Sequence, residues 1–335
     1  IAEKLKRILI SRTDSIGDVT LTLPLCVALK KKYPELHITF LAARYTISVI
    51  ESCTSIDEII DYNDLLDQSK LGQINQLKEG KFDAIVHVFP NKEVAVLAKA
   101  AKIPQRIGTS HRGFHLLTCN QRINFTRKKS EFHEAQLNFH LLRNIGWKEL
   151  PTWADLTDDL SYFKVKTVVD LDILKTEKPK VILHTKSQGS AVEWPIEKYI
   201  ELSDRLIKSG CRVFFTGTEK EGLIIRPDVE FTEDRIDTTG QFSLSELVSF
   251  IDHSDMLVAC STGPLHLSGI LNKNCIGLFT PKHPMHPGRW RPLGRNSKTI
   301  TSAEKCPCKS KEKCTCIEDI AVEQVYHEIQ AKLKL

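Results

Sequence analysis

The strongest constraint on the fold is residues 8–33, which predict a strand, a polar loop and a helix in immediate succession. The apolar run 8–10 is short and suits a buried strand, and residues 11–17 form a polar turn. From Asp18 onward, apolar side chains recur at helical spacing as far as the lysines at 30–32, cations that the end of a helix favours. The loop has one glycine and no lysine, so it is neither a dinucleotide fingerprint nor a P-loop.

The rest of the chain repeats this alternation in two series. In the first we expect strands at 37–42, 56–61, 82–89 and 106–108, the last at a sheet edge, and helices at 45–51, 65–78, 93–101 and 131–144, with 112–124 irregular. In the second we expect strands at 181–184, 212–216, 256–259 and 275–279, and helices at 195–209, 244–252, after 266 as far as 271, and 322–333. Strands that alternate with helices predict an α/β fold with parallel, doubly wound sheets.

Length and a change of composition divide the chain into two domains. A chain of 335 residues suggests two domains of ordinary size, and residues 151–179 are charged and weakly periodic. We expect an N-terminal domain at 1–160, a linker at 161–178, a second domain at 179–320, and a C-terminal helix at 321–335 that packs back on the N-terminal domain. Two similar halves with loops at their strand ends suggest a ligand held between them.

The composition is that of a soluble, globular chain with a mild positive charge. The formal net charge of +5 suits acidic ligands or an anionic membrane surface and does not by itself argue for nucleic acid. No apolar run reaches the length of a membrane span, and no signal-peptide pattern opens the chain, although an upstream piece could have been removed before Ile1. Five cysteines lie in apolar segments, which indicates reduced thiols and a cytoplasmic location: Cys26, Cys53, Cys211, Cys260 and Cys275.

Four further cysteines lie close together near the C-terminus: Cys306, Cys308, Cys314 and Cys316. Four thiolates can hold a tetrahedral zinc ion, which would be a structural metal. The two Cys-x-Cys pairs differ from the usual Cys-x2-Cys spacing, so free or disulfide-paired thiols are the alternative.

Asp18 is the first candidate for chemistry because it lies where the first helix begins. A carboxylate there can cap free backbone N–H groups, and this structural role is one interpretation. The other is functional, since open α/β sheets bind ligands at the carboxyl ends of their strands. A helix N-terminus weakens a carboxylate as a base, whereas the nearby negative charge of Asp14 acts in the opposite direction.

Two loops of the second half have the composition of phosphate-binding sites. Thr185, Lys186 and Ser187 follow a strand and precede Gly189, so a positive charge and backbone N–H groups are available to an anion. In the segment 261–266, hydroxyl groups and a proline prepare a helix N-terminus for an anion. Ordinary strand-to-helix connections are the structural alternative for both loops.

Basic residues gather in the later part of the first half: Arg106, His111, Arg112, His115, Arg122, Arg127, Lys128 and Lys129. Such a group is usually a solvated face. Because these basic residues belong to the first half of the chain, they could also bind an anionic acceptor. We expect the run 127–129 to add weak attraction to an anionic membrane surface.

Several short motifs occur in a fixed order: Ser15-Ile-Gly-Asp18 with Leu23-Pro24, then Trp194-Pro195, then Ser261-Thr-Gly-Pro-Leu-His266. With Arg106-Ile-Gly108, His133-Glu134 and the Cys-rich end, they resemble glycosyltransferase family 9, the ADP-heptose:lipopolysaccharide heptosyltransferases and their relatives, over nearly the whole chain. The resemblance implies a GT-B fold, in which two Rossmann-like domains face each other across a cleft. It also implies transfer of a sugar from a nucleotide-diphosphate donor, with inversion and without a metal or another required cofactor.

The resemblance also implies roles for individual residues. Asp18 matches the family's proposed general base, which takes the proton of the acceptor hydroxyl as that oxygen attacks the anomeric carbon. The expected donor-binding residues are Thr185, Lys186, Ser187, Glu219 (with Glu221 as its alternative on the ribose), Ser261, Thr262, Gly263, Pro264 and His266. The expected acceptor-binding residues are Ser15, Gly17, Asn91, Lys92, His111 and Arg112, the last because Arg suits bidentate contacts to carboxylate and phosphate.

Two departures from the family lie on the donor side. Glu193 stands where a Lys or Arg is common, and Ser261 stands where an Asp is common. The donor is therefore either a nucleotide sugar other than ADP-heptose or one whose phosphate charge Lys186 neutralises alone.

We expect a monomer at the cytoplasmic face of the inner membrane, peripheral to it, that binds no nucleic acid. Its expected reaction is transfer of heptose from ADP-heptose to the anionic glycolipid of the lipopolysaccharide inner core. Two rival hypotheses are a nucleotide-sugar epimerase or hydrolase on the same fold, and a non-catalytic nucleotide-sugar-binding protein.

Overall fold

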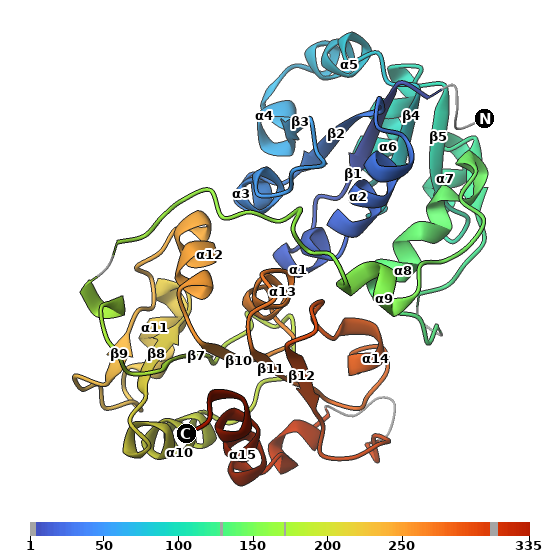
Figure 1. Ribbon diagram of the computed structural model, residues 1–335. Helices are drawn as coiled ribbons and strands as arrows, with labels where there is room; N and C mark the ends of the chain where they lie inside the picture. The colour runs from blue at the N-terminus through green and yellow to red at the C-terminus, as the bar shows by residue number, and fades with distance from the viewer. Residues whose placement is uncertain (1–4, 128–129, 171, 309–313) are drawn as a thin grey trace. The chain divides into compact units, whose positions relative to one another are not determined.

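The strands of the residues that the structure describes form two parallel six-stranded sheets, one in each half of the chain (Figure 1). The structure is a computed structural model, and it describes residues 5–127, 130–170, 172–308 and 314–335. The chain divides into unit 1, Ile1–Lys164, and unit 2, Val165–Leu335. The division therefore falls inside the segment 161–178 that the sequence suggests as a linker.

Unit 1 contains a sheet with the strand order β3-β2-β1-β4-β5-β6, and its pairings are parallel. Its strands are β1 (Arg7–Ser11), β2 (His37–Ala42), β3 (Glu58–Asp61), β4 (Ala84–His87), β5 (Gln105–Thr109) and β6 (Gln121–Ile123). Its helices are α1 (Ile16–Thr20), α2 (Leu23–Lys32), α3 (Ile47–Glu51), α4 (Tyr62–Asp67), α5 (Lys70–Glu79), α6 (Lys92–Ala100), α7 (Gly113–Thr118), α8 (Glu134–Phe139) and α9 (Trp153–Thr157), with 3₁₀ turns η2 (Arg44–Thr46) and η3 (His140–Ile145).

Several expectations for unit 1 need correction. The strand expected at a sheet edge, β5, pairs with β4 and with β6, so it lies inside the sheet. The stretch 112–124, expected to be irregular, contains α7 and β6, which are too short to show a period. The helix expected over 65–78 is divided into α4 and α5, because Ser69 caps a new helix. The helix after Asp18 is also divided, with a proline in the first turn of α2.

Unit 2 contains a second parallel sheet, with the order β12-β11-β10-β7-β8-β9. Its strands are β7 (Lys180–His184), β8 (Arg212–Thr216), β9 (Arg235–Asp237), β10 (Met256–Cys260), β11 (Cys275–Leu278) and β12 (Ser297–Ile300). Its helices are α10 (Ile196–Lys208), α11 (Glu219–Ile225), α12 (Leu244–Asp252), α13 (Gly263–Ile270), α14 (Pro287–Trp290) and α15 (Val322–Leu333), with 3₁₀ turns η4 (Asp172–Leu174) and η5 (Cys316–Asp319).

The sequence pattern misses four elements of unit 2: β9, β12, α11 and α14. Strands β9 and β12 are the two edges of the sheet and contain more polar than apolar residues. They therefore lack the apolar run from which a strand is predicted. Helix α14 has only four residues. By contrast, the helix expected at 244–252 is confirmed as α12, which begins with a capping box formed by Ser243 and Glu246.

Both sheets have the same connectivity when each is numbered from its own first strand. The order is 3-2-1-4-5-6, the Rossmann order, which confirms the prediction of doubly wound sheets. In this order the direction of winding reverses between β1 and β4 in unit 1, and between β7 and β10 in unit 2. Loops at the carboxyl ends of these strands are where such sheets bind their ligands.

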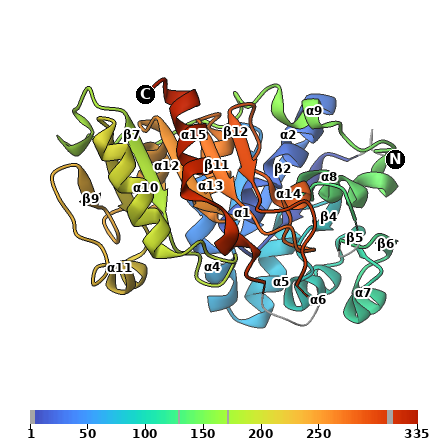
Figure 2. The ribbon, with the colours of Figure 1, turned by 90° about the horizontal axis from the view of Figure 1, so that it is seen from below.

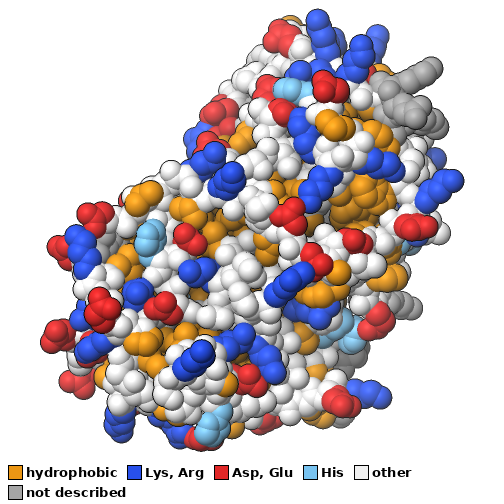
Figure 3. Space-filling view, in the orientation of Figure 1, with side chains coloured by type: hydrophobic (Ala, Val, Ile, Leu, Met, Phe, Trp, Pro, Cys, Tyr) orange, Lys and Arg blue, Asp and Glu red, His pale blue; other side chains and the backbone are white. Residues whose placement is uncertain are grey.

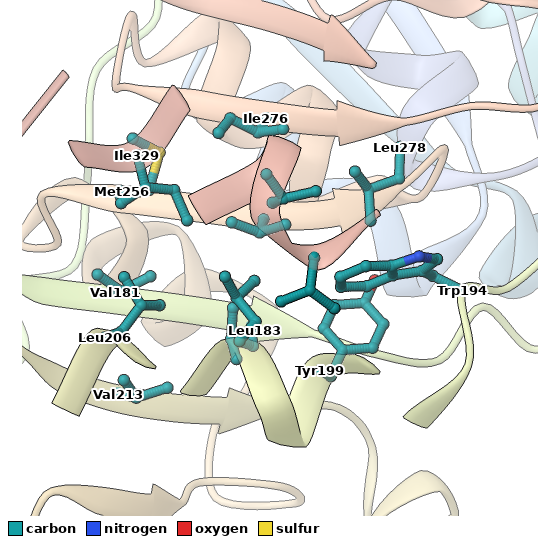
Figure 4. Close-up of a cluster of buried hydrophobic side chains, with 14 of the residues drawn as sticks. Val181, Leu183, Trp194, Tyr199, Leu206, Val213, Met256, Ile276, Leu278 and Ile329 are labelled. Atoms are coloured by element: carbon teal, nitrogen blue, oxygen red, sulfur yellow. The ribbon is translucent and has the colours of Figure 1, made fainter. Parts of the chain in front are cut away.

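The core of unit 2 includes the C-terminal helix. Trp194 and Tyr199 are buried, and their rings meet edge to face with centroids 4.9 Å apart (Figure 4). Helix α15 lies beside α10 (Figure 2) and adds Val325 and Ile329 to the same cluster. Since these side chains complete the core of unit 2, α15 is part of that unit.

The surface is mixed in charge. On the face drawn in Figure 3, Lys and Arg side chains alternate with Asp and Glu, in keeping with a net charge of only +5. No helix among the described residues is long and apolar enough to cross a membrane.

Candidate functional site

Asp18 lies in the first turn of α1, just beyond the carboxyl end of β1. Ser15 is the N-cap of this helix, and its Oγ accepts a hydrogen bond from the Asp18 N–H. The same hydroxyl donates to Asp18 Oδ2 over 2.5 Å. The capping that the sequence offered as one role for Asp18 is thus performed by Ser15. The Asp18 side chain keeps 20% of its surface exposed, so its carboxylate is accessible.

A buried guanidinium holds this carboxylate. The Arg12 side chain is 4% exposed, and it forms ion pairs with Asp14 and with Asp18. Its Nε lies 2.9 Å from Asp14 Oδ1. Its Nη1 lies 3.4 Å from Glu134 Oε1 and 3.3 Å from Asn138 Oδ1 on α8. Arg12 therefore connects the loop after β1 to a helix more than a hundred residues later in the chain.

A second guanidinium completes the network from the other side. Arg127 pairs with Glu134, whose side chain is 1% exposed, and donates to Asn138 Oδ1 over 3.1 Å. It also lies over the ring of Phe125 and donates to the Val88 carbonyl over 3.3 Å. The expectation that Arg127 belongs to a membrane-attracting surface run is wrong, because its charge is used inside unit 1. Residues 128 and 129 of that run lie outside the described residues.

The charges in this network shift one another's protonation. Burial raises the pKa of the Asp14 carboxyl, with the charge of Asp18 adding to the effect and Arg12 opposing it. Burial tends to lower the pKa of Arg12, but the carboxylates of Asp18 and Asp14 outweigh it, so the pKa is raised. Arg12 is consequently a permanent cation.

The expected acceptor residues follow neighbouring strands of the sheet. Asn91 comes after β4, the neighbour of β1, and it caps α6 while donating to Thr13 Oγ1 over 3.2 Å. Its amide is therefore engaged in holding two loops together. His111 and Arg112 come after β5, the next strand, and both are exposed, as are Lys92 and Ser15, whereas Gly17 is buried.

In unit 2 the expected phosphate loop after β7 already contains a carboxylate. Glu193 Oε1 accepts from the Ser187 N–H over 2.8 Å and from Ser187 Oγ over 2.9 Å. Glu193 Oε2 lies 3.2 Å from Lys186 Nζ. The groups suited to an anion thus converge on this one side chain. The sequence marks Glu193 as a departure from the family, but nothing in it indicates these partners.

Two buried hydroxyls at the winding reversal of unit 2 are without a hydrogen-bond partner among the described residues. They are Thr185 Oγ1 and Thr262 Oγ1, in residues that are 3% and 4% exposed. Thr185 follows β7 and Thr262 follows β10, and these strands are paired. Thr262 is the N-cap of α13 without a side-chain capping bond, so the N-terminus of this helix is open to an anion.

The remaining donor residues divide into two kinds. Ser261 and Gly263 flank Thr262, while Pro264 and His266 are buried in the first turns of α13. Glu221 closes a capping box with Thr218 and is buried, so it has a structural role. Glu219 is exposed, and hydrogen bonds from Arg226 lower the pKa of its carboxyl. Of the two acids considered for the ribose, Glu219 is the accessible one.

The four C-terminal cysteines gather at one point of unit 2. The Sγ atoms of Cys306, Cys308, Cys314 and Cys316 all lie within 4.8 Å of one another, so the group could bind a metal ion. A hydrogen bond from the Thr315 backbone N–H lowers the pKa of the Cys308 thiol to about 7. Burial raises the pKa of Cys316.

Comparison with known proteins agrees with this arrangement. The family model for glycosyltransferase family 9 (heptosyltransferase) matches residues 71–319. A Haemophilus influenzae protein described as a glycosyltransferase, with no substrate in its description, is 27% identical over 338 residues, or 97% of this chain and 96% of that protein. Lipopolysaccharide heptosyltransferase 3 of Escherichia coli is 23% identical over 292 residues, or 84% of each chain. The structure of E. coli ADP-heptose lipopolysaccharide heptosyltransferase II gives a TM-score of 0.75 at 18% identity, covering 98% of this chain and 99% of that chain.

Two Rossmann-like units in one chain are the hallmark of the GT-B fold, and the structural likeness shows that fold. Within this class, the chain belongs to glycosyltransferase family 9. The resemblance of its short motifs to that family is thereby confirmed, and the protein is an enzyme of glycosyl transfer.

The Arg12 network predicts a large difference between a buried and an exposed arginine. Arg12→Ala removes the cation that compensates Asp14 and Asp18, and we expect the free energy of unfolding to fall by about 3–5 kcal/mol. Arg44→Ala is the control, since its ion pairs with Asp61 and Asp64 are exposed to solvent, and it should leave stability nearly unchanged. Urea denaturation followed by fluorescence measures both variants. Equal stability of the two variants would contradict the structural importance of Arg12.

Proposed function

We propose that this enzyme transfers heptose, with inversion, from ADP-heptose to an anionic acceptor of the lipopolysaccharide inner core. Asp18 is the general base, unit 1 binds the acceptor, and unit 2 binds the donor. The observation that supports this most strongly is the accessible Asp18 carboxylate, held by a buried cation at the carboxyl end of β1. An accessible carboxylate at the carboxyl end of a strand is placed to accept a proton from a bound hydroxyl.

The reaction needs one proton acceptor and one anion site. The acceptor hydroxyl attacks the anomeric carbon, its proton passes to Asp18, and the bond between that carbon and the diphosphate oxygen breaks. The leaving ADP keeps the electron pair of that bond. Lys186 and the open N-terminus of α13 stabilise the charge on the diphosphate, with the Thr185 and Thr262 hydroxyls as donors to its oxygens. These groups supply the needed charge, so the proposed mechanism includes no catalytic metal.

The role of Asp18 predicts a selective loss of turnover. Asp18→Asn should bind ADP normally and lose roughly 10²–10⁴-fold in kcat, because the amide cannot accept the proton. Single-turnover kinetics and calorimetric ADP binding measure the two properties. Asp14→Asn is the matched control, since Asp14 pairs with the same Arg12, and it should keep more of the activity.

The result also separates the rival hypotheses. Near-normal turnover in Asp18→Asn would remove the base assignment and favour a binding protein or another reaction. Release of free sugar, or a change in its stereochemistry, in wild-type enzyme without an acceptor would favour the hydrolase or the epimerase.

Glu193 is proposed to tune the donor site. Its carboxylate neutralises Lys186, so part of the positive charge meant for the diphosphate is already compensated. It also accepts a hydrogen bond from the Ser187 N–H, which stabilises the conformation of the loop. This arrangement is consistent with a donor that is bound loosely through its phosphates and more firmly through its other groups.

A charge-neutral substitution tests this idea. Glu193→Gln keeps a hydrogen-bond acceptor for Ser187 but removes the negative charge, and we expect ADP to bind about fivefold tighter. Lys186→Ala should weaken ADP binding about tenfold and adenosine binding little, because the lost contact is to phosphate. Isothermal titration measures both ligands. Glu197→Gln, on the exposed first turn of α10, controls for long-range charge, and equal effects at both glutamates would contradict a specific role.

The acceptor side is proposed to include α7. This helix exposes Leu116 and Leu117, which are 58% and 75% accessible, and Arg112 immediately precedes it. Exposed apolar side chains next to a free cation suit contact with an anionic lipid surface. By contrast, the Arg106 and Arg122 side chains donate to backbone carbonyls of their own segment. This combination supports a peripheral position at the inner membrane.

Two variants separate acceptor recognition from membrane contact. Arg112→Ala should raise the acceptor KM even with a soluble, deacylated inner-core acceptor, because the lost contact is to the sugar acids or phosphates. The double variant Leu116→Ser with Leu117→Ser should lower activity only when the acceptor is in anionic vesicles. Arg122→Ala serves as the control for loss of a nearby charge. If Arg112→Ala changed donor binding and not acceptor kinetics, the two units would have the opposite roles.

A further inference from the structure

The Cys-rich segment has no part in the proposed reaction, yet its geometry is ordered. Cys306 and Cys308 follow β12, whereas Cys314 and Cys316 lie at the start of η5. The Sγ of Cys306 is 3.6 Å from that of Cys314 and 3.6 Å from that of Cys316, and the Sγ of Cys308 is 3.7 Å from that of Cys316. Two separate stretches of chain thus bring four sulfur atoms to one point.

These distances distinguish a metal site from disulfides. A disulfide requires sulfur atoms about 2.05 Å apart. Four sulfurs about 2.3 Å from a central zinc ion form a tetrahedron with edges of about 3.8 Å. The three distances of 3.6, 3.6 and 3.7 Å match the edges of that tetrahedron, and the four cysteines are free of disulfide bonds.

Hydrogen-bonding groups lie beside the sulfur atoms. Thr280, which follows β11, places its Oγ1 2.8 Å from Cys314 Sγ. Backbone N–H groups of Thr315 and Cys308 point at the sulfurs of Cys308 and Cys306. Donors of this kind orient metal-bound thiolates and stabilise their charge.

The segment after the cluster is joined to the donor loop. Ile317 and Ile320 are fully buried in the core of unit 2. The Ile320 carbonyl accepts from Trp194 Nε1 over 3.1 Å and from Lys198 Nζ over 2.9 Å. Trp194 directly follows Glu193, so whatever fixes Cys316 also fixes the end of the phosphate loop.

We propose that Cys306, Cys308, Cys314 and Cys316 bind one zinc ion as a structural tetrathiolate site. The ion joins the stretch that follows β12 to the stretch that leads into η5, and Cys314 in turn contacts Thr280 beyond the end of β11. It thereby holds Ile320, and through it Trp194 and the donor loop, in place. It performs no step of the sugar transfer. The proposal does not depend on which sugar or acceptor the enzyme uses.

Metal analysis of the full chain tests the site directly. Protein purified without a histidine tag and without added metal should contain one zinc ion per chain by mass spectrometry of the elements. Cys308→Ser and Cys316→Ser should each lose it. Cys211→Ser is the matched control, since Cys211 is also buried in unit 2, and it should keep its zinc. Cys308 is the less buried ligand of the two variants, so its substitution is the one expected to leave a folded protein for analysis.

Cobalt and thiol chemistry give readouts independent of zinc content. Wild-type protein stripped by a chelator and given Co²⁺ should develop the visible bands of tetrahedral cobalt thiolate, and Cys308→Ser should not. Zinc should raise the melting temperature of the stripped wild type and leave that of Cys308→Ser unchanged. Stoichiometric iron in place of zinc would overturn the choice of metal while supporting the four-thiolate site. Substoichiometric metal of every kind together with no cobalt bands, or four disulfide-bonded cysteines in mass spectra, would overturn the proposal.

Discussion

The buried guanidinium of Arg12 is the interaction on which the organisation of unit 1 depends. A charge with 4% exposure is tolerated only if opposite charges surround it, and Asp14, Asp18 and Glu134 do so. Two of these acids lie in the loop after β1, and the third is on α8. The position of the candidate base is therefore determined by a contact between segments far apart in sequence. If Asp18 is the base, a carboxylate held in this way needs little reorganisation when substrate binds.

The sequence predicts the architecture well because alternating apolar strands and amphipathic helices leave few ways to cover a parallel sheet. The strands β2, β7 and β8 and the helix α15 have nearly the bounds that their patterns indicate. The strands that the pattern misses are β6, β9 and β12, which are sheet edges. An edge strand of three or four residues is half exposed, so it has no apolar run to recognise. For the same reason β5 was expected at an edge that β6 in fact occupies.

The loops that form the candidate site could be predicted from the sequence, whereas the side-chain contacts within the site could not. Asp18, Lys186 and Thr262 could be singled out because each follows a strand and opens a helix or a polar turn. Arg12 and Arg127 could not be singled out, because an arginine in a polar segment has the sequence pattern of a solvent-exposed cation. Their contacts with Asn138 on α8 appear only in the folded structure. Local patterns describe which residues begin a helix, whereas a buried ion pair is visible only after the fold has formed.

The two units differ in the sign of the central charge at their candidate sites. In unit 1 the buried cation Arg12 is surrounded by acids and holds the Asp18 carboxylate at the carboxyl end of β1. In unit 2 an internal acid, Glu193, is bound by the groups that would otherwise receive an anion. In the proposed donor site, a diphosphate would have to compete with the Glu193 carboxylate for Lys186. Under the same proposal, a diphosphate is distinguished from an internal carboxylate by the Thr185 and Thr262 hydroxyls and by the N-terminus of α13. These groups have no hydrogen-bond partner among the described residues, so they give up none when a diphosphate binds.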